Sequence, residues 1–198
     1  MDTDRYVQID WKSALPEQLD WHWRTQLRPR LEGMTDAEYF WEPVPGCWSI
    51  RRRGESTAPI SVGAGEYAID YGFPEPDPSP VTTIAWRLAH MIVGLFASRT
   101  ATHFGGPPVN WPTWEYAATA KEALRQLDET YAAWRDSVRG LGEAGLARPV
   151  GPAEADGQYA DFPMADLILH INREAIHHGA EIALLRDLYQ WKGDSNAL

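Results

Sequence analysis

The sequence predicts an all-α protein, a four-helix bundle with a long elaborated connection between its first and second helices. Two observations lead to this expectation. Apolar residues recur every three or four positions in four separate segments, which is the repeat of a helix with one buried face. Proline and glycine are concentrated between these segments, above all between the first two. A single domain, 1–198, is expected because a chain of 198 residues can bury one substantial core.

The first expected helix covers residues 15–31, and its apolar side chains are spaced four apart. These side chains are Leu15, Leu19, Trp23, Leu27 and Leu31. Pro16 suits the first turn of this helix because the amide of that turn needs no intrahelical partner. A short helical turn over residues 35–38 follows, since Thr35 and Glu38 form a capping pattern.

A long connection is expected from Cys47 to Pro80. It contains the arginine cluster of residues 51–53, two glycine-bearing turns and four prolines near its end. Alternating apolar residues between Ile60 and Tyr71 allow a short hairpin within it. Connections of this length often cover a functional site, so this one is a candidate lid.

The second expected helix covers residues 81–102 and is apolar on nearly every side. A helix without a polar face belongs in the centre of a fold, so we expect it to be buried. His103 begins a turn-rich link that ends at Pro112. Thr113 is then expected to cap a third helix that runs to Arg139.

The fourth expected helix runs from Ala160 to Trp191, after a glycine- and proline-bearing connection over residues 140–157. Its start is marked by Pro163, and its apolar stripe faces the interior. Glu174 and His178 interrupt that stripe one turn apart. A buried charge needs a partner, so these two side chains either share a metal ion or hydrogen-bond to each other.

A third metal ligand is available on the second helix. In a bundle, His90 can meet Glu174 and His178 near one end of the core. Three protein ligands leave one coordination position open, as in catalytic rather than structural metal sites. The alternative is a purely structural network, in which the same side chains are hydrogen-bonded within the core.

Four further polar residues of the fourth helix flank the candidate ligands. They are His170, Arg173, His177 and Glu181. His170 and His177 can orient a ligand, replace one, or form a polar flank of the helix. Arg173 and Glu181 are interpreted as part of a solvated face or an interface.

Composition and charge exclude several classes of protein. A net charge of −10 argues against nucleic-acid binding, which needs a basic surface. The longest apolar run, Met91 to Ala97, is too short to span a bilayer. The acidic, polar N-terminus does not resemble a secretory signal, so a cytoplasmic location is expected. The single cysteine, Cys47, allows no internal disulfide, and nothing around it indicates an activated thiol.

Three stretches of the chain resemble the DinB-like superfamily of four-helix-bundle proteins. They are TDAEYFWEPVPGCWSI, TIAWRLAHMI and HINREAIHHGAEIALLRDLY. The segment REAIHH is similar to the metal-binding domain of the mycothiol-dependent maleylpyruvate isomerases, whose ligands are His, Glu and His. The resemblance implies that His90, Glu174 and His178 bind a divalent metal. Zinc is the expected ion, with nickel or iron as alternatives.

The resemblance also implies an enzyme that activates a low-molecular-weight thiol, such as mycothiol, or water against a small-molecule substrate. Thiol transfer in conjugation or detoxification is the implied class, with hydrolysis as a related possibility. Maleylpyruvate isomerase activity itself is not expected, because those enzymes carry a further C-terminal domain and this chain ends soon after the fourth helix. The alternative is a non-catalytic metal- or ligand-binding module of a stress response. A homodimer is a further expectation.

Overall fold

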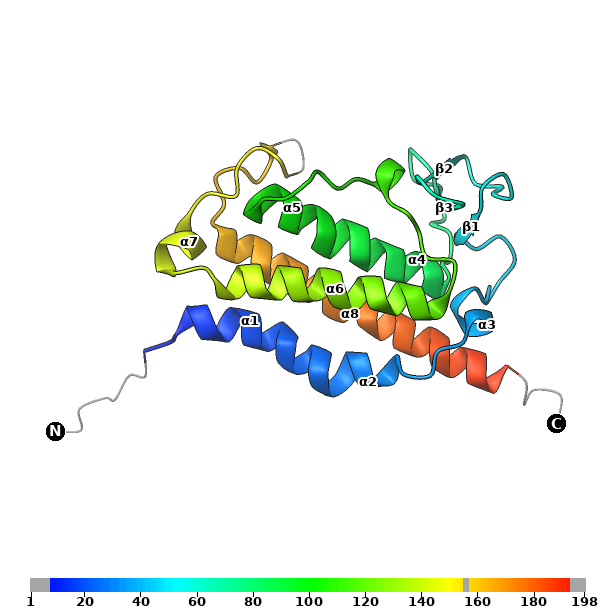
Figure 1. Cartoon of the computed structure of the whole chain (residues 1–198), viewed down its shortest axis with the longest axis horizontal. Coiled ribbons are helices and arrows are strands. Elements are labelled where there is room, and N and C mark those ends of the chain that lie inside the picture. The colour runs from blue at the N-terminus through cyan, green and yellow to red at the C-terminus, as the bar shows by residue number, and fades with distance from the viewer. Residues whose placement is uncertain (1–7, 155–156, 193–198) are drawn as a thin grey trace.

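The protein is predominantly helical, with one small sheet (Figure 1). The computed structural model describes residues 8–154 and 157–192. Four long helical segments lie alongside one another, and the sheet lies at one end of them. The all-α prediction is therefore wrong in one respect, because part of the long connection pairs into strands.

The first helical segment consists of three consecutive pieces. They are α1 (Trp11–His22), η1 (Trp23–Leu27) and α2 (Arg28–Arg30). The segment begins earlier than the predicted Leu15, because the Asp10 side chain accepts the amide of Lys12 at 3.1 Å and caps the helix there. The piece η1 is a π-helical turn. The predicted turn after it is α3 (Asp36–Tyr39), and Thr35 caps it as expected.

The second helical segment also consists of three pieces. They are α4 (Ile84–Ala89), η2 (His90–Ala97) and α5 (Ser98–Phe104). It begins after the predicted Val81, because the Thr83 hydroxyl accepts the amide of Trp86 at 3.2 Å. In η2 the helix is wound as a π-helix, and the amide of Ser98 bonds to the carbonyl of Val93. Such turns often mark functional sites, and His90 is the first residue of this one.

The third and fourth helical segments are reached through short helical turns. The remaining helices are η3 (Trp111–Thr113), α6 (Ala120–Arg139), α7 (Glu143–Ala147) and α8 (Met164–Trp191). Thr113 does not cap a long helix, because Asn110 accepts its amide at 3.1 Å and confines it to the single turn η3. Thr119 caps α6 instead, by accepting the amide of Glu122 at 3.2 Å. The fourth helix starts at Met164, just after Pro163.

The sheet is antiparallel and has three strands in the order β1-β3-β2. Its strands are β1 (Ile50–Arg52), β2 (Ile60–Val62) and β3 (Tyr67–Tyr71). The predicted hairpin is confirmed by the pairing of Ile60 with Tyr71. Strand β1 escaped prediction because it is only three residues long and carries two arginines. Arg51 donates at 2.9 Å to the buried carboxylate of Asp70, which fixes β1 against β3.

The core lies between the four helical segments. As predicted, the second segment is its most buried part, with Ile84, Leu88 and Met91 fully enclosed. The first and third segments meet through Trp23 and Tyr131, whose rings stack at 3.7 Å. The second and fourth segments also lie side by side, which brings the candidate ligands of the two helices together.

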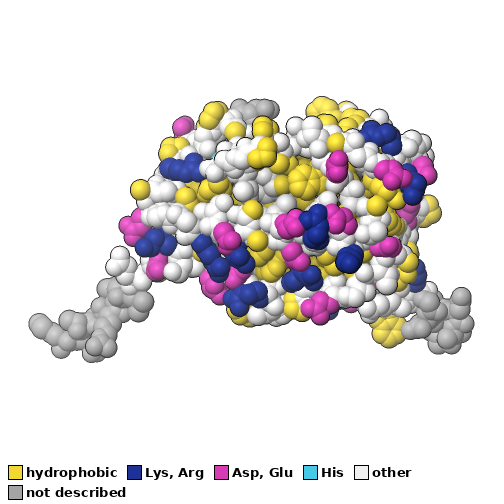
Figure 2. Space-filling model, viewed as in Figure 1, with side chains coloured by type: hydrophobic (Ala, Val, Ile, Leu, Met, Phe, Trp, Pro, Cys, Tyr) yellow, Lys and Arg dark blue, Asp and Glu magenta, His cyan; other side chains and the backbone are white. Residues whose placement is uncertain are grey.

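Charged side chains of both signs are intermixed on the face shown in Figure 2. Arg28 of the first segment, for example, pairs with Asp128 of α6 at 2.8 Å. The arginine cluster of the long connection is also paired, since Arg51 and Arg52 both contact carboxylates. No helix within residues 8–154 or 157–192 is long and apolar enough to cross a membrane.

Candidate metal centre

The second and fourth segments place the imidazole of His90 against that of His178. The two ring centroids are 4.7 Å apart, and the ring planes are almost perpendicular at 82°. His178 is only 7% exposed. Burial lowers the pKa of His90 to about 3, and the nearby charges of His178, Arg87 and Arg99 act in the same direction. His90 is therefore neutral at physiological pH, which is the form that binds metals.

Two tryptophans hold the His90 ring between them. Trp86 stacks on it with centroids 5.5 Å apart and planes 5° apart, and Trp111 stacks at 5.9 Å and 22°. Trp86 is itself anchored, since its indole N–H donates to the carbonyl of Asp70 at 2.8 Å. At Gly94 an added Cβ would lie 3.0 Å from Trp111, so the absence of a side chain there leaves room for the stack.

The imidazole of His90 makes no hydrogen bond to any residue that the structure describes. Metal-binding histidines usually donate their second N–H to a carboxylate or a carbonyl, which sets the orientation of the ring. Here stacking takes over that task. The ring nitrogens of His90 consequently remain free to bind a cation.

Glu174 and His178 lie one turn apart on α8 with their polar atoms close together. Oε2 of Glu174 lies 3.5 Å from Nε2 of His178, while Nδ1 of His178 lies 2.7 Å from Oε2 of Glu181. Because a carboxylate only accepts, Nδ1 donates to Glu181, and Nε2 is the nitrogen of His178 that can face a metal ion. Two ligands of a tetrahedral zinc ion with bonds of about 2.0–2.1 Å lie roughly 3.4 Å apart. The separation of Oε2 of Glu174 and Nε2 of His178 therefore fits two ligands of one divalent metal.

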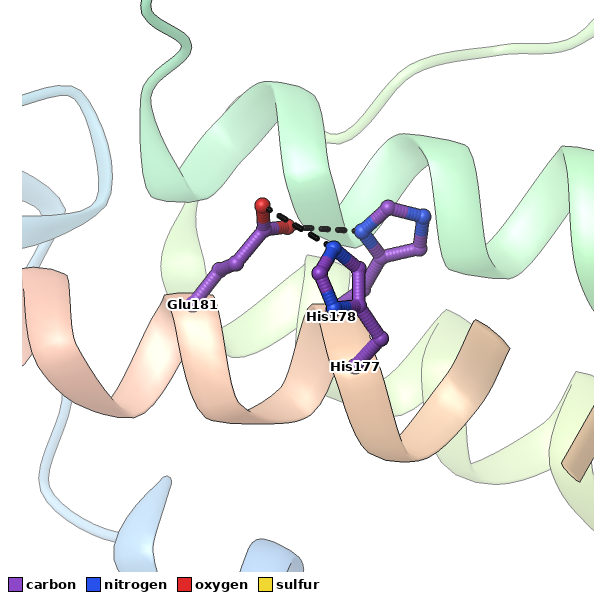
Figure 3. Close-up of side chains that lie close together, drawn as sticks. All are labelled: His177, His178 and Glu181. Atoms are coloured by element: carbon purple, nitrogen blue, oxygen red, sulfur yellow. Dashed lines mark hydrogen bonds and ion pairs between the residues drawn. The ribbon is translucent and has the colours of Figure 1, made fainter. Parts of the chain in front are cut away.

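A second group on the same helix also fits a divalent metal. The ligand atoms of His177, His178 and Glu181 all lie within 4.8 Å of one another, and Figure 3 shows both imidazoles beside the Glu181 carboxylate. One feature of the surroundings weakens this group as a cation site. The guanidinium of Arg87 lies 3.1 Å from Oε2 of Glu181 and already neutralises that carboxylate. Glu174, in contrast, has no arginine or lysine within 4.0 Å among the described residues.

The comparison with known families covers most of the chain. The sequence profile of the DinB superfamily matches residues 18–182, a range that contains His90, Glu174, His178 and Glu181. The chain belongs to the DinB superfamily. No curated protein and no solved structure gives a significant match. The match confirms the predicted superfamily. It does not test the closer similarity to the maleylpyruvate isomerases.

Two residues of this DinB-superfamily chain were misjudged from the sequence. Glu181, interpreted as part of a solvated face or an interface, is half-buried and orients His178. The spacing rule that selected Glu174 could have found it, since Glu181 follows His178 by three positions. His103 is not in a loop but in the last turn of α5, where it bonds to Glu154 at 2.9 Å.

The other histidines of α8 lie at the edge of the centre. His177 is 65% exposed on its side chain, and its Nε2 lies 3.4 Å from Oε1 of Glu181. His170 lies one turn before Glu174 on α8, and its Nδ1 is 3.9 Å from Oε1 of Glu174. Cys47 is buried, and burial raises the pKa of its thiol, which agrees with the absence of an activated thiol.

Proposed function

We propose that this protein is a divalent-metal-dependent enzyme and that its metal ligands are His90, Glu174 and His178, presented by a four-helix bundle. The observation that carries the proposal is the pair of candidate ligand atoms on Glu174 and His178, which lie 3.5 Å apart, close to the separation of two ligands of one zinc ion. A neutral, unbonded His90 lies beside them. Zinc is the proposed ion, with nickel or iron as alternatives.

Surrounding residues position the two histidine ligands. Glu181 holds His178 by its Nδ1 hydrogen, and Arg87 holds Glu181 in turn. Trp86 and Trp111 hold His90. When bound, the metal would supply a positive charge that lowers the pKa of a thiol or a water in its open coordination position. Three ligands from the protein leave such a position free.

The proposed reaction is the transfer of a low-molecular-weight thiol, such as mycothiol, to an electrophilic small molecule. The similarity of the segment REAIHH to mycothiol-dependent maleylpyruvate isomerases supports this class. Hydrolysis by a metal-activated water uses the same ligands and is the nearest alternative. A cytoplasmic location, where such thiols are kept reduced, belongs to the same proposal.

Elemental analysis of protein purified without a metal-affinity tag tests the ligand set. Wild type is expected to contain about one equivalent of metal, as catalytic zinc sites do. Glu174→Gln should lose the metal, because the amide is a weaker, uncharged ligand, while the matched variant His177→Ala should keep it. Loss in His177→Ala and retention in Glu174→Gln would instead place the metal at His177, His178 and Glu181.

Activity assays then separate an enzyme from a binding protein. Wild type and His177→Ala should catalyse thiol conjugation of small electrophiles, and Glu174→Gln should not. A full equivalent of metal without turnover in any thiol-transfer or hydrolysis assay would contradict the enzyme and favour a non-catalytic metal-binding module.

Replacing Trp111 with leucine tests whether stacking positions His90. Metal affinity is expected to fall by about 10- to 100-fold, the usual cost of losing a group that orients a ligand. Competition with a chromogenic chelator measures the change. Trp21→Leu is the matched control, because Trp21 is 53% exposed on α1 and should not affect affinity. Equal affinities in the two variants would refute the positioning role of Trp111.

A further inference from the structure

A cavity of about 530 Å³ lies at the start of α8, and its lining residue His170 is one turn before Glu174. The end of α5 and the chain segment before α8 complete its walls. Much of its lining is apolar or aromatic: Val150, Tyr159, Phe162 and Leu167. Its volume is within the range of about 300–1,000 Å³ typical of small-molecule sites. The ionisable side chains that line it, which restrict the choice of ligand, are Arg99, Glu154, Asp166, His170 and Arg173.

Two of these polar groups form an adjacent pair of donors. His170 and Arg173 lie one turn apart on α8, and both line the cavity. An N–H of Arg173 lies 3.2 Å from Nδ1 of His170 and donates to it. The hydrogen of the neutral imidazole is then on Nε2, which can donate further. The guanidinium also keeps further N–H groups for a planar anion.

Two of the other charges around the cavity, on Glu154 and Arg99, are paired with each other. Glu154 pairs with Arg99 at 3.0 Å and with His103 at 2.9 Å. Burial alone would raise the pKa of Glu154, but the His103 hydrogen bond and the Arg99 charge outweigh it and lower that pKa. Asp166 lies in the first turn of α8, where the helix terminus stabilises a negative charge. Arg173 has no carboxylate within 4.0 Å among the described residues, so its guanidinium is unpaired there.

We propose that the cavity binds a small organic acid, whose carboxylate contacts Arg173 and His170 and whose apolar or aromatic body packs on Tyr159 and Phe162. One unpaired guanidinium matches a monoanion better than a phosphate dianion. Nδ1 of His170 lies 3.9 Å from Oε1 of Glu174, so the carboxylate end faces the metal centre. This inference adds a substrate class to the proposed function and rests on it only for the step from binding to turnover.

Isothermal titration calorimetry with three probes of one length tests the proposal. The probes are 3-phenylpropionate, 3-phenylpropanol and 3-phenylpropylamine, titrated into chelator-treated and metal-loaded protein. The carboxylate is expected to bind about tenfold more tightly than the alcohol, and the amine most weakly. Arg173→Gln should weaken carboxylate binding about tenfold and leave alcohol binding unchanged.

Two further variants are matched to this measurement. Arg52→Gln removes an equally exposed arginine on the sheet, far from the cavity lining, and should not change carboxylate binding. Phe162→Ala should weaken all three probes alike, because it removes apolar contact and no charge. Phe162 is 48% exposed, so its loss does not threaten the fold.

Equal binding of the three probes, an unchanged affinity in Arg173→Gln, or no binding at millimolar concentration would each overturn the proposal. Failure of the metal centre gives a different pattern. Glu174→Gln would then match wild type in metal content, while the carboxylate preference of chelator-treated protein would persist. The two proposals therefore fail independently.

Discussion

Replacing His90 with alanine should abolish stoichiometric metal binding, because it removes the only proposed ligand from the second helical segment. A ligand that binds only the folded state stabilises it by about 2.7 kcal/mol at a free concentration one hundred times its Kd. Zinc should therefore raise the free energy of unfolding of wild type by about that amount, and should leave His90→Ala unchanged. Urea unfolding with and without zinc measures both values.

His22→Ala is the matched control for this experiment. His22 ends α1 and, like His90, has a pKa lowered by burial, but it does not contact the proposed ligands. Its variant should keep both the metal and the stabilisation by zinc. Full metal content in His90→Ala would contradict the proposed site, whatever the stability of that variant.

Replacing Arg186 with alanine should destabilise the protein by about 3–5 kcal/mol, the usual cost of breaking a buried ion pair from one side. Arg186 donates to both carboxylate oxygens of Glu38 and to the backbone carbonyls of Arg30 and Glu32. The side chains of the pair are only 10% and 6% exposed. The variant therefore leaves the Glu38 charge without a partner and away from water.

Urea unfolding of two further variants distinguishes the lost pair from general damage. Arg30→Ala breaks the neighbouring surface pair with Asp187, whose side chains are 49% and 53% exposed, and should cost less than about 1 kcal/mol. A double variant with methionine at positions 38 and 186 should recover most of the stability, since it leaves no buried charge. A loss below about 1 kcal/mol in Arg186→Ala would show that the pair is not desolvated as described.

Local patterns predicted the helices well. The four-residue spacing of Leu15, Leu19, Trp23 and Leu27 identified the first segment, and the largely apolar character of residues 81–102 identified the buried second one. Errors arose where two local signals competed. At Thr113 a capping residue preceded a helical pattern, but Asn110 closed a separate turn first. Strand β1 depends on pairing with β3, which no local pattern records.

The candidate site was likewise predictable only in part. The spacing of Glu174 and His178 on one helix was readable, because a helix brings residues four apart together whatever surrounds it. Their relation to His90 was an inference from the expected bundle. The stacking of Trp111 on His90 was not predictable, because Trp111 comes from a separate turn whose position depends on the packing of the whole chain.

By itself, the sequence determined the helical segments, the Thr35 cap, and which polar residues share a face of α8. These features depend on neighbours within one or two turns, and the backbone geometry of a helix is always the same. Only the tertiary structure decided that Arg87 neutralises Glu181, that two tryptophans hold His90, and that Arg173 lines a cavity. Those relations join distant segments, and the packing and desolvation that select them are properties of the assembled core.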